Sequence, residues 1–284
     1  MATTEPQHVF IITGANRGLG RAIAKTVADR SESAGESRHL LLVGRNRQAL
    51  EAAGAEVVNS RTRVYIAGDV DFAQPPRKTT ERVLASLEQI VANLPAHVRI
   101  RLTLVQNAGT LGDLSKTVDQ YDDDEIASYT VLNFVSFGAL TSKFLAYSKG
   151  LEAERITVVN LTSLLAVAAF ANWGLYAALK AARDQLLKVV AVEHTNDARV
   201  KTLSYAPGPL DSDMQADVRA NIGDEAQKAT YTQMHREKKL VSPGATAHVL
   251  CDLLDAWDFE SGAHIDIYDI VAPPSPAGIS GSTS

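Results

Sequence analysis

The sequence predicts an α/β fold: a single domain built on a doubly wound, parallel, seven-stranded sheet flanked by helices. Short β-branched or leucine-rich runs alternate with longer segments whose apolar residues recur every three or four positions. Runs such as VFII, LLLV and ITVV are continuously apolar, as expected of strands that helices cover on both faces. The chain has 284 residues, 45% hydrophobic and 21% charged, which supplies a large core and favours one folded unit.

The predicted elements alternate along the chain in the order that such a sheet requires. We expect strands near residues 8–13, 39–43, 63–67, 100–105, 155–161, 199–205 and 264–268. We expect helices near residues 18–30, 47–58, 77–94, 123–149, 174–195 and 243–256. Together these elements place one domain over residues 1–270.

Three segments depart from the regular alternation. SESAGES, at 31–37, is polar and is interpreted as a surface loop. The polar segment at about 207–242 lies between a strand end and a helix, a position that suits a mobile substrate lid, with a plain surface excursion an equal alternative. The segment 271–284, rich in Pro, Gly and Ser, is predicted to be a disordered tail.

Composition excludes several classes of protein. The net charge is −5 and no long Lys/Arg run occurs, so we expect no nucleic-acid partner. Cys251 is the single cysteine, which excludes an internal disulfide and a cysteine-based zinc site; we predict no metal. MATTEPQHVF lacks the features of a secretory signal, and polar residues interrupt the uncharged stretch 156–179. The sequence therefore predicts a cytoplasmic protein without a membrane partner.

A glycine-rich turn follows the first predicted strand and opens the first helix. In TGANRGLG, at 13–20, Gly14, Gly18 and Gly20 permit a tight turn in which backbone N–H groups approach a pyrophosphate at a helix N-terminus. The strand and helix around it predict a dinucleotide site of the Rossmann type.

The end of the second predicted strand indicates which dinucleotide binds. An acidic residue there would hold the ribose 2′-hydroxyl of NAD, whereas an arginine accommodates the 2′-phosphate of NADP. LLLVG is followed by Arg45, and Arg17 in the glycine turn adds a second guanidinium. The sequence therefore favours NADP(H).

Asp69-Val70 and Asn107-Ala108-Gly109 end the third and fourth strands at the same edge, although Asp69 is equally well interpreted as a turn cap.

Four polar residues form a candidate catalytic set. Tyr176 and Lys180 stand four residues apart at the start of a predicted helix, so their side chains share one face. A nearby cation favours the phenolate, which would make Tyr176 an effective acid–base group. Ser163 follows the fifth strand, where its hydroxyl would reach a substrate carbonyl. Asn133 lies among apolar residues of a helix and is predicted to be buried with a specific partner.

In this order and spacing, the glycine turn, Asn-Ala-Gly, Ser163 and the Tyr-x-x-x-Lys pair resemble the short-chain dehydrogenase/reductase superfamily. The resemblance implies that Tyr176 protonates the carbonyl oxygen and that Lys180 lowers its pKa and binds the nicotinamide ribose. It also implies that Ser163 orients the carbonyl and that Asn133 holds a water leading protons to Lys180. Carried over onto the matching positions, the implied cofactor contacts are Gly14, Asn16, Arg17, Gly18, Leu19, Gly20, Arg45, Asn46, Asp69, Val70, Asn107, Ala108, Gly109, Tyr176, Lys180, Pro207, Gly208 and Leu210.

Longer segments resemble one branch of that superfamily, the sepiapterin reductase family, between about Val9 and Asp269. They are TGANRGLGRAIA, NAGTLGDLSK, LTSLLAVAAFANWGLYAALKAARDQLLKVVAVE, YAPGPLDSDM and SGAHIDIYD; Gln106, where many relatives have Asn, is a small departure. The resemblance implies NADPH-dependent reduction of the side-chain ketones of 6-pyruvoyltetrahydropterin and sepiapterin in tetrahydrobiopterin biosynthesis. It also implies a homodimer formed through the predicted helices 123–149 and 174–195.

A pterin substrate would need an anchor, and the resemblance assigns it to Asp266 in SGAHIDIYD. A carboxylate can accept two parallel hydrogen bonds from an aminopyrimidinone. With Ser163 and Tyr176 at the reacting end, Trp173 and Met214 are candidate apolar walls, although core packing explains either of them equally well. Two alternatives remain: a general NADPH-dependent ketone or diketone reductase, and a non-catalytic NADP-binding sensor, against which Ser163, Tyr176 and Lys180 argue.

Overall fold

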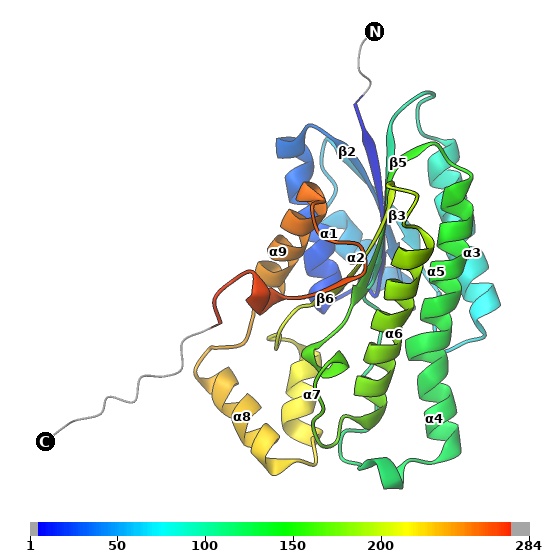
Figure 1. Ribbon diagram of the computed structural model, residues 1–284. Coiled ribbons are helices and arrows are strands. Elements are labelled where there is room, and N and C mark those ends of the chain that lie inside the picture. The colour runs from blue at the N-terminus through cyan, green and yellow to red at the C-terminus, as the bar shows by residue number, and fades with distance from the viewer. Residues whose placement is uncertain (1–4, 274–284) are drawn as a thin grey trace, which may run out of the picture.

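The structure is a computed structural model that describes residues 5–273. Its centre is a parallel sheet with the strand order β3-β2-β1-β4-β5-β6-β7 (Figure 1). The strands are β1 Gln7–Thr13, β2 Ser37–Val43, β3 Thr62–Ala67, β4 Ile100–Gln106, β5 Ala153–Leu161, β6 Val200–Ala206 and β7 Ala263–Asp266. The order reverses between β1 and β4, and ligands of such sheets bind beyond the carboxyl ends of the strands at this point. The predicted fold class is confirmed.

Helices cover both faces of the sheet. They are α1 Gly18–Ala34, α2 Arg47–Ala55, α3 Pro76–Ala92, α4 Asp123–Thr130, α5 Ser136–Lys149, α6 Gly174–Glu193, α7 Asp213–Asn221, α8 Glu225–Arg236 and α9 Pro243–Ala256. Figure 1 shows α1, α2 and α9 on one face and α3, α5 and α6 on the other. Phe10 and Ile12 of β1 pack into the first layer, whereas Val9 and Ile11 pack into the second. The continuous apolar run of β1 therefore follows from the alternation of side chains between two covered faces.

The structure corrects three predicted boundaries. Most of the expected loop at 31–37 is the last part of α1, because Ser31 is buried with its hydroxyl on the Ala28 carbonyl (2.7 Å), and the helix ends at Gly35 with φ 64°. The helix expected over 123–149 is divided by a π-helical turn at Val131–Val135. The last strand ends at Asp266, which caps a 3-10 turn at Ile267–Asp269. Most of the predicted disordered tail, residues 274–284, lies outside the described residues.

The segment 207–242 contains α7 and α8, which lie beyond the carboxyl ends of the strands (Figure 1). Backbone bonds close its two ends against each other, from the Asp211 N–H to the Val241 carbonyl (2.8 Å) and from the Val241 N–H to the Pro209 carbonyl (2.9 Å). The segment is therefore a helical excursion with a fixed base. A lid movement remains a prediction.

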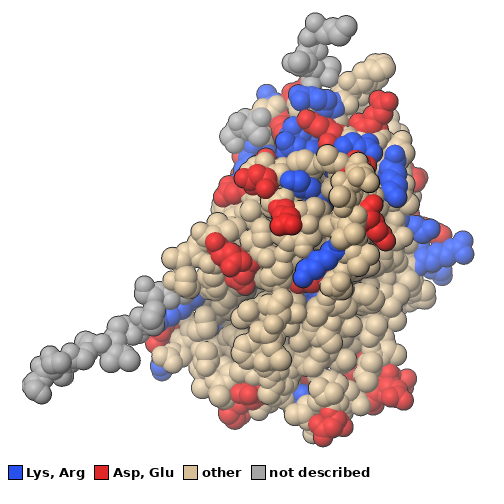
Figure 2. Space-filling view, viewed as in Figure 1, with Lys and Arg blue, Asp and Glu red and all other residues tan. Residues whose placement is uncertain are grey.

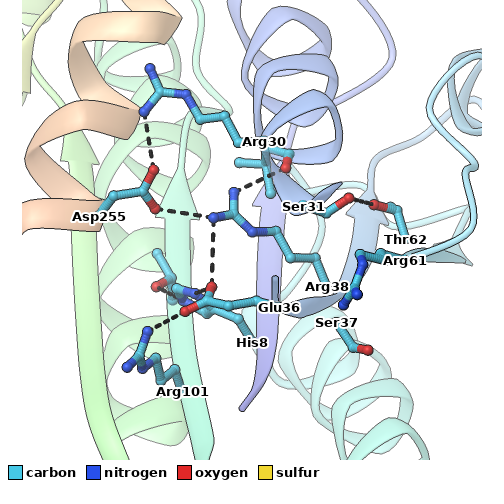
Figure 3. A network of polar contacts seen from close by, with 12 residues as sticks. His8, Arg30, Ser31, Glu36, Ser37, Arg38, Arg61, Thr62, Arg101 and Asp255 are labelled. Atoms are coloured by element: carbon cyan, nitrogen blue, oxygen red, sulfur yellow. Dashed lines mark hydrogen bonds and ion pairs between the residues drawn. The ribbon is translucent and has the colours of Figure 1, made fainter. Parts of the chain in front are cut away.

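Charged groups gather at the opposite, amino-terminal edge of the sheet. Figure 2 shows them at the top of the molecule, while the middle of this face is mainly uncharged. There Arg38 is buried between Asp255 (3.2 Å) and Glu36 (3.6 Å), and Glu36 also pairs with Arg101 (Figure 3). Across residues 5–273, no helix is long and apolar enough to cross a membrane, and no cluster of three potential metal-binding side chains occurs.

Candidate active site

The glycine turn between β1 and α1 needs its three glycines for two reasons. Gly14 and Gly18 adopt left-handed φ values of 67° and 53°, which other residues rarely adopt. A Cβ on Gly20 would lie 2.4 Å from the Gly14 carbonyl oxygen, so any side chain there collides with backbone. No atom lies within 4 Å of the Cβ position of Gly18, and the first turn of α1 has no acidic residue. This open helix N-terminus fits a pyrophosphate.

The ends of β1 and β4 hold this turn in place. The Thr13 hydroxyl oxygen accepts the N–H groups of Asn107 and Ala108, both at 3.0 Å. The Asn107 amide donates to the carbonyls of Thr13 (3.0 Å) and Gly14 (3.2 Å). Asn107 thus supports the phosphate turn from behind. Thr13 was not predicted from the sequence, where it appears as a hydroxyl residue at the end of an apolar run.

The basic residues predicted to hold an extra phosphate are exposed beside the turn. Arg45 follows β2, and Arg17 precedes α1 and pairs with Asp213 of α7 at 3.0 Å. Asp69 has φ 58°, and its carboxylate pairs with Arg47 at 3.1 Å. Arg45 therefore offers an exposed guanidinium at this edge, and Arg17 offers a second one whose present partner is Asp213; a guanidinium fits the phosphate of a phosphorylated ribose. The remaining predicted cofactor residues also follow strand ends: Asn16, Leu19, Asn46, which caps α2, Val70, Pro207, Gly208 and Leu210.

Tyr176 and Lys180 occupy the first two turns of α6. The Lys180 ammonium donates to the carbonyl of Leu161, the last residue of β5, and lies 5.4 Å from the centre of the Tyr176 ring. Ser163 follows β5 in an extended conformation, its hydroxyl oxygen accepts the Leu165 N–H at 3.2 Å, and the same hydroxyl lies near enough to Tyr176 to lower the pKa of that phenol. The structure thus brings together the predicted serine, tyrosine and lysine at the carboxyl edge of β5.

Burial dominates the electrostatics of these groups. Desolvation raises the pKa of Tyr176 to about 12, opposed by the charge of Arg183 and the Ser163 hydrogen bond. Desolvation, and after it the charge of Arg183, lower the pKa of Lys180 to about 7, while the charge of Asp184 opposes them. The positive charge acting on Tyr176 in this structure is therefore that of Arg183; the same role for Lys180 stays a prediction.

Asn133 lies in the π-helical turn between α4 and α5 and is 5% exposed. Its side-chain oxygen accepts the Thr110 N–H (3.0 Å), and its amide donates to the Tyr129 carbonyl (3.1 Å). The prediction of a buried asparagine with specific partners is confirmed. A water on Asn133 stays a prediction.

Arg183 is a residue of the site that the sequence analysis missed. It is 2% exposed, and its Nε donates to the backbone carbonyl of Asn133 while Nη2 lies 3.5 Å from the Ala108 carbonyl. The available signal was a charged residue in KAARD, on the same side of the helix as Lys180. Gln106 links β4 to α5 in a similar way, since its amide donates to Thr141 at 2.6 Å.

The two candidate walls lie in different environments. Trp173 is 4% exposed, its indole N–H donates to Gln227 of α8 (2.7 Å), and its ring packs edge-on against Tyr176 with 5.3 Å between the ring centres. Trp173 thus joins α8 to Tyr176, as the core-packing interpretation expects. Met214 on α7 is 43% exposed. Three exposed apolar side chains after Ser163 were missed as candidate walls: Leu164, Val167 and Phe170.

Asp266 ends β7 beside Ala206, the last residue of β6. Its carboxylate accepts the Tyr268 N–H at 2.9 Å, so it caps the following turn and remains partly exposed. Two residues earlier, Nδ1 of His264 lies 2.6 Å from the carboxylate of Asp184, which stands one helical turn beyond Lys180. This partly buried contact connects the strand that carries Asp266 with the helix that carries Tyr176 and Lys180.

A glycine turn at a parallel-sheet edge, with a partly buried Ser-Tyr-Lys set beside it, defines a short chain dehydrogenase. Residues 8–223 match the model of the short chain dehydrogenase family, and the chain belongs to that family.

Within the family, this chain is an oxidoreductase of the sepiapterin reductase type. It is 38% identical to the sepiapterin reductase of Rattus norvegicus, over 92% of this chain and 97% of that protein. It is 33% identical to the one of Xenopus tropicalis, over 91% and 95%. The crystal structure of the KRED1-Pglu enzyme is similar, with a TM-score of 0.73 and 25% identity over 91% of this chain and 100% of that chain.

Proposed function

We propose that this enzyme reduces a side-chain ketone of a pterin, such as sepiapterin or 6-pyruvoyltetrahydropterin, with NADPH. The observation that carries the proposal is the meeting of Ser163, Tyr176 and Lys180 at the sheet edge that also holds the open glycine turn. The similarity to sepiapterin reductases over nearly the whole chain supports the substrate class.

NADPH, when bound, supplies the hydride. Tyr176 then donates its phenolic proton to the carbonyl oxygen, and the Ser163 hydroxyl orients that oxygen by a hydrogen bond. We expect Lys180, whose ammonium donates to the Leu161 carbonyl, to bind the cofactor ribose. Because burial holds the pKa of Tyr176 near 12, the phenol is protonated at neutral pH, as an acid in carbonyl reduction must be.

The preference for NADPH rests on Arg17 and Arg45, with no acid at the end of β2. We expect kcat/KM with NADPH to exceed that with NADH by at least about tenfold, which corresponds to about 1.4 kcal/mol. Two guanidinium–phosphate contacts readily provide that difference. Equal efficiency with both cofactors would contradict the assignment.

The proposed pterin anchor is Asp266, and the exposed apolar side chains after Ser163, with Met214, are the proposed surface for the flat ring. A general diketone reductase is the second candidate, because the chain is also 26% identical to a benzil reductase of Bacillus cereus over 90% of its length.

NADPH oxidation measured with sepiapterin, with a simple diketone and without substrate distinguishes the functions. Turnover strongly favouring sepiapterin supports the pterin proposal, and equal turnover supports the general reductase. No turnover with either supports a binding protein without catalysis.

We also propose a cytoplasmic homodimer formed through α4, α5 and α6. The supporting observation is that apolar side chains of α4, of α6 and of the turn between α4 and α5 are exposed: Ile126, Val135, Val189 and Val192. Light scattering on the wild type and on Val192→Glu tests this arrangement, and a monomeric wild type would refute it.

A further inference from the structure

A buried arginine lies where three parts of the active site meet. Arg183 belongs to α6, three residues after Lys180, and is 2% exposed. Its Nε donates to the Asn133 carbonyl in the π-helical turn, and its Nη2 approaches the Ala108 carbonyl after β4. The guanidinium carbon lies 4.8 Å from the centre of the Phe137 ring. One side chain thus joins the catalytic helix to the turn at Asn133 and to the cofactor edge.

The contact with Asn133 bears on the proton path expected there. A backbone carbonyl has two lone pairs, and Arg183 uses one of them. The guanidinium therefore occupies one acceptor position of this carbonyl, and a water bound to the carbonyl would have to use the other. In addition, Arg183 lines a cavity of about 10 Å³ with Thr13, Gln106 and Ser136, about the space one water needs.

From this geometry we infer that Arg183 is a positioning residue of the reductase: its buried guanidinium fixes the Asn133 turn and keeps a positive charge beside Tyr176 and Lys180. This inference rests on the proposed function for its kinetic consequences, but the charge effect on Lys180 exists without substrate.

The charged and titratable groups around the pair determine the sign of that effect. Several polar groups face Tyr176, Lys180 or Arg183. They are Ser163 after β5, Tyr129 of α4, Tyr231 of α8 and Asp184 of α6, and Asp184 in turn contacts His264 of β7. Asp184 raises the pKa of Lys180, whereas Arg183 lowers it. Removing the guanidinium charge therefore raises the pKa of both Lys180 and Tyr176.

Arg38 provides a matched control at the other edge of the sheet. It is 1% exposed, donates to the Val27 carbonyl (3.0 Å) and lies 5.8 Å from the centre of the Phe10 ring (Figure 3 shows its ion pairs). Arg38 is thus an equally buried arginine without contact to the catalytic groups. Loss of a purely structural arginine is expected to lower the melting temperature and leave catalytic ionisations unchanged.

The experiment compares wild type, Arg183→Met, Arg183→Lys and Arg38→Met. NMR titration of carbon-labelled lysines, with the Lys180 signal assigned by its absence in Lys180→Gln, measures the pKa of Lys180 without substrate. We expect Arg183→Met to raise that pKa by at least half a unit, to shift the basic limb of the kcat/KM profile to higher pH and to lower kcat at least tenfold. Arg183→Lys should restore the pKa and the limb.

Arg38→Met should change neither ionisation. An unchanged Lys180 titration and an unchanged basic limb in folded Arg183→Met would overturn the inference. If Arg183→Met does not fold, the Lys180 titration is repeated on Arg183→Gln, which keeps a donor for the Asn133 carbonyl but no charge. An unchanged Lys180 pKa in Arg183→Gln would likewise overturn the inference. A wild type inactive with sepiapterin would refute the proposed function, and the Lys180 titration would still decide the role of Arg183.

Discussion

Asp266 has two expected roles, recognition of a pterin and support of the fold, and two substitutions can separate them. Its carboxylate caps the turn at Ile267–Asp269 by accepting the Tyr268 N–H at 2.9 Å, and it is partly exposed beside the end of β6. Asp266→Ala removes both the cap and the proposed pterin anchor. Asp266→Asn keeps an oxygen that can accept the Tyr268 N–H but removes the charge, so the two substitutions divide the roles.

The expected magnitudes differ enough to be measured. Loss of a cap costs about 1 kcal/mol of unfolding free energy, which lowers the melting temperature by roughly 2–4 °C in a protein of this size. Loss of a charge-assisted pair to the aminopyrimidinone costs about 2–4 kcal/mol of transition-state binding, a decrease in kcat/KM of about 30-fold to 900-fold. The stability change is therefore too small to imitate the expected kinetic change.

The assay measures kcat/KM for sepiapterin and for a small diketone, with melting curves for each variant. We expect both variants to lose activity toward sepiapterin and retain it toward the diketone, which does not reach the anchor, and only Asp266→Ala to melt earlier. An equal loss for both substrates, or full sepiapterin activity in Asp266→Asn, would refute the reasoning.

Three further predictions concern the tyrosine, the glycine turn and a buried histidine. Tyr176→Phe should abolish reduction while NADPH affinity, followed by fluorescence titration, stays within about threefold; more than a few per cent of wild-type turnover would exclude Tyr176 as the proton donor. Gly20→Ala should weaken NADPH binding at least tenfold because its Cβ would lie 2.4 Å from the Gly14 carbonyl oxygen, and unchanged affinity would contradict the proposed turn. His39 is buried and its pKa is lowered to about 4, first by desolvation and then by the charge of a neighbouring arginine. The folded state therefore disfavours protonated His39. The contribution of His39 to the free energy of unfolding is fully present above about pH 6.5 and falls by roughly 3 kcal/mol toward pH 4. His39→Asn should flatten this part of the stability profile in urea titrations, and an unchanged slope would argue against the shift.

The sequence alone determined the features that depend on neighbouring residues. Continuous apolar runs predicted the strands because both faces of the sheet are covered, and the glycine spacing predicted the turn because two of its positions need left-handed backbone. Tyr176 and Lys180 were predictable as a pair because four residues in a helix place two side chains on one face.

Only the tertiary structure decided which remote groups meet. Arg183 contacts Asn133, 50 residues away in the sequence, and Arg17 pairs with Asp213, 196 residues away. Asp266 caps a turn where a longer strand was expected. Ser31 belongs to a helix, although the polar residues around it predicted a loop. Local patterns specify periodicity and turn chemistry, whereas buried polar partners are set by the packing of layers, since each buried donor must find whichever acceptor the fold brings near.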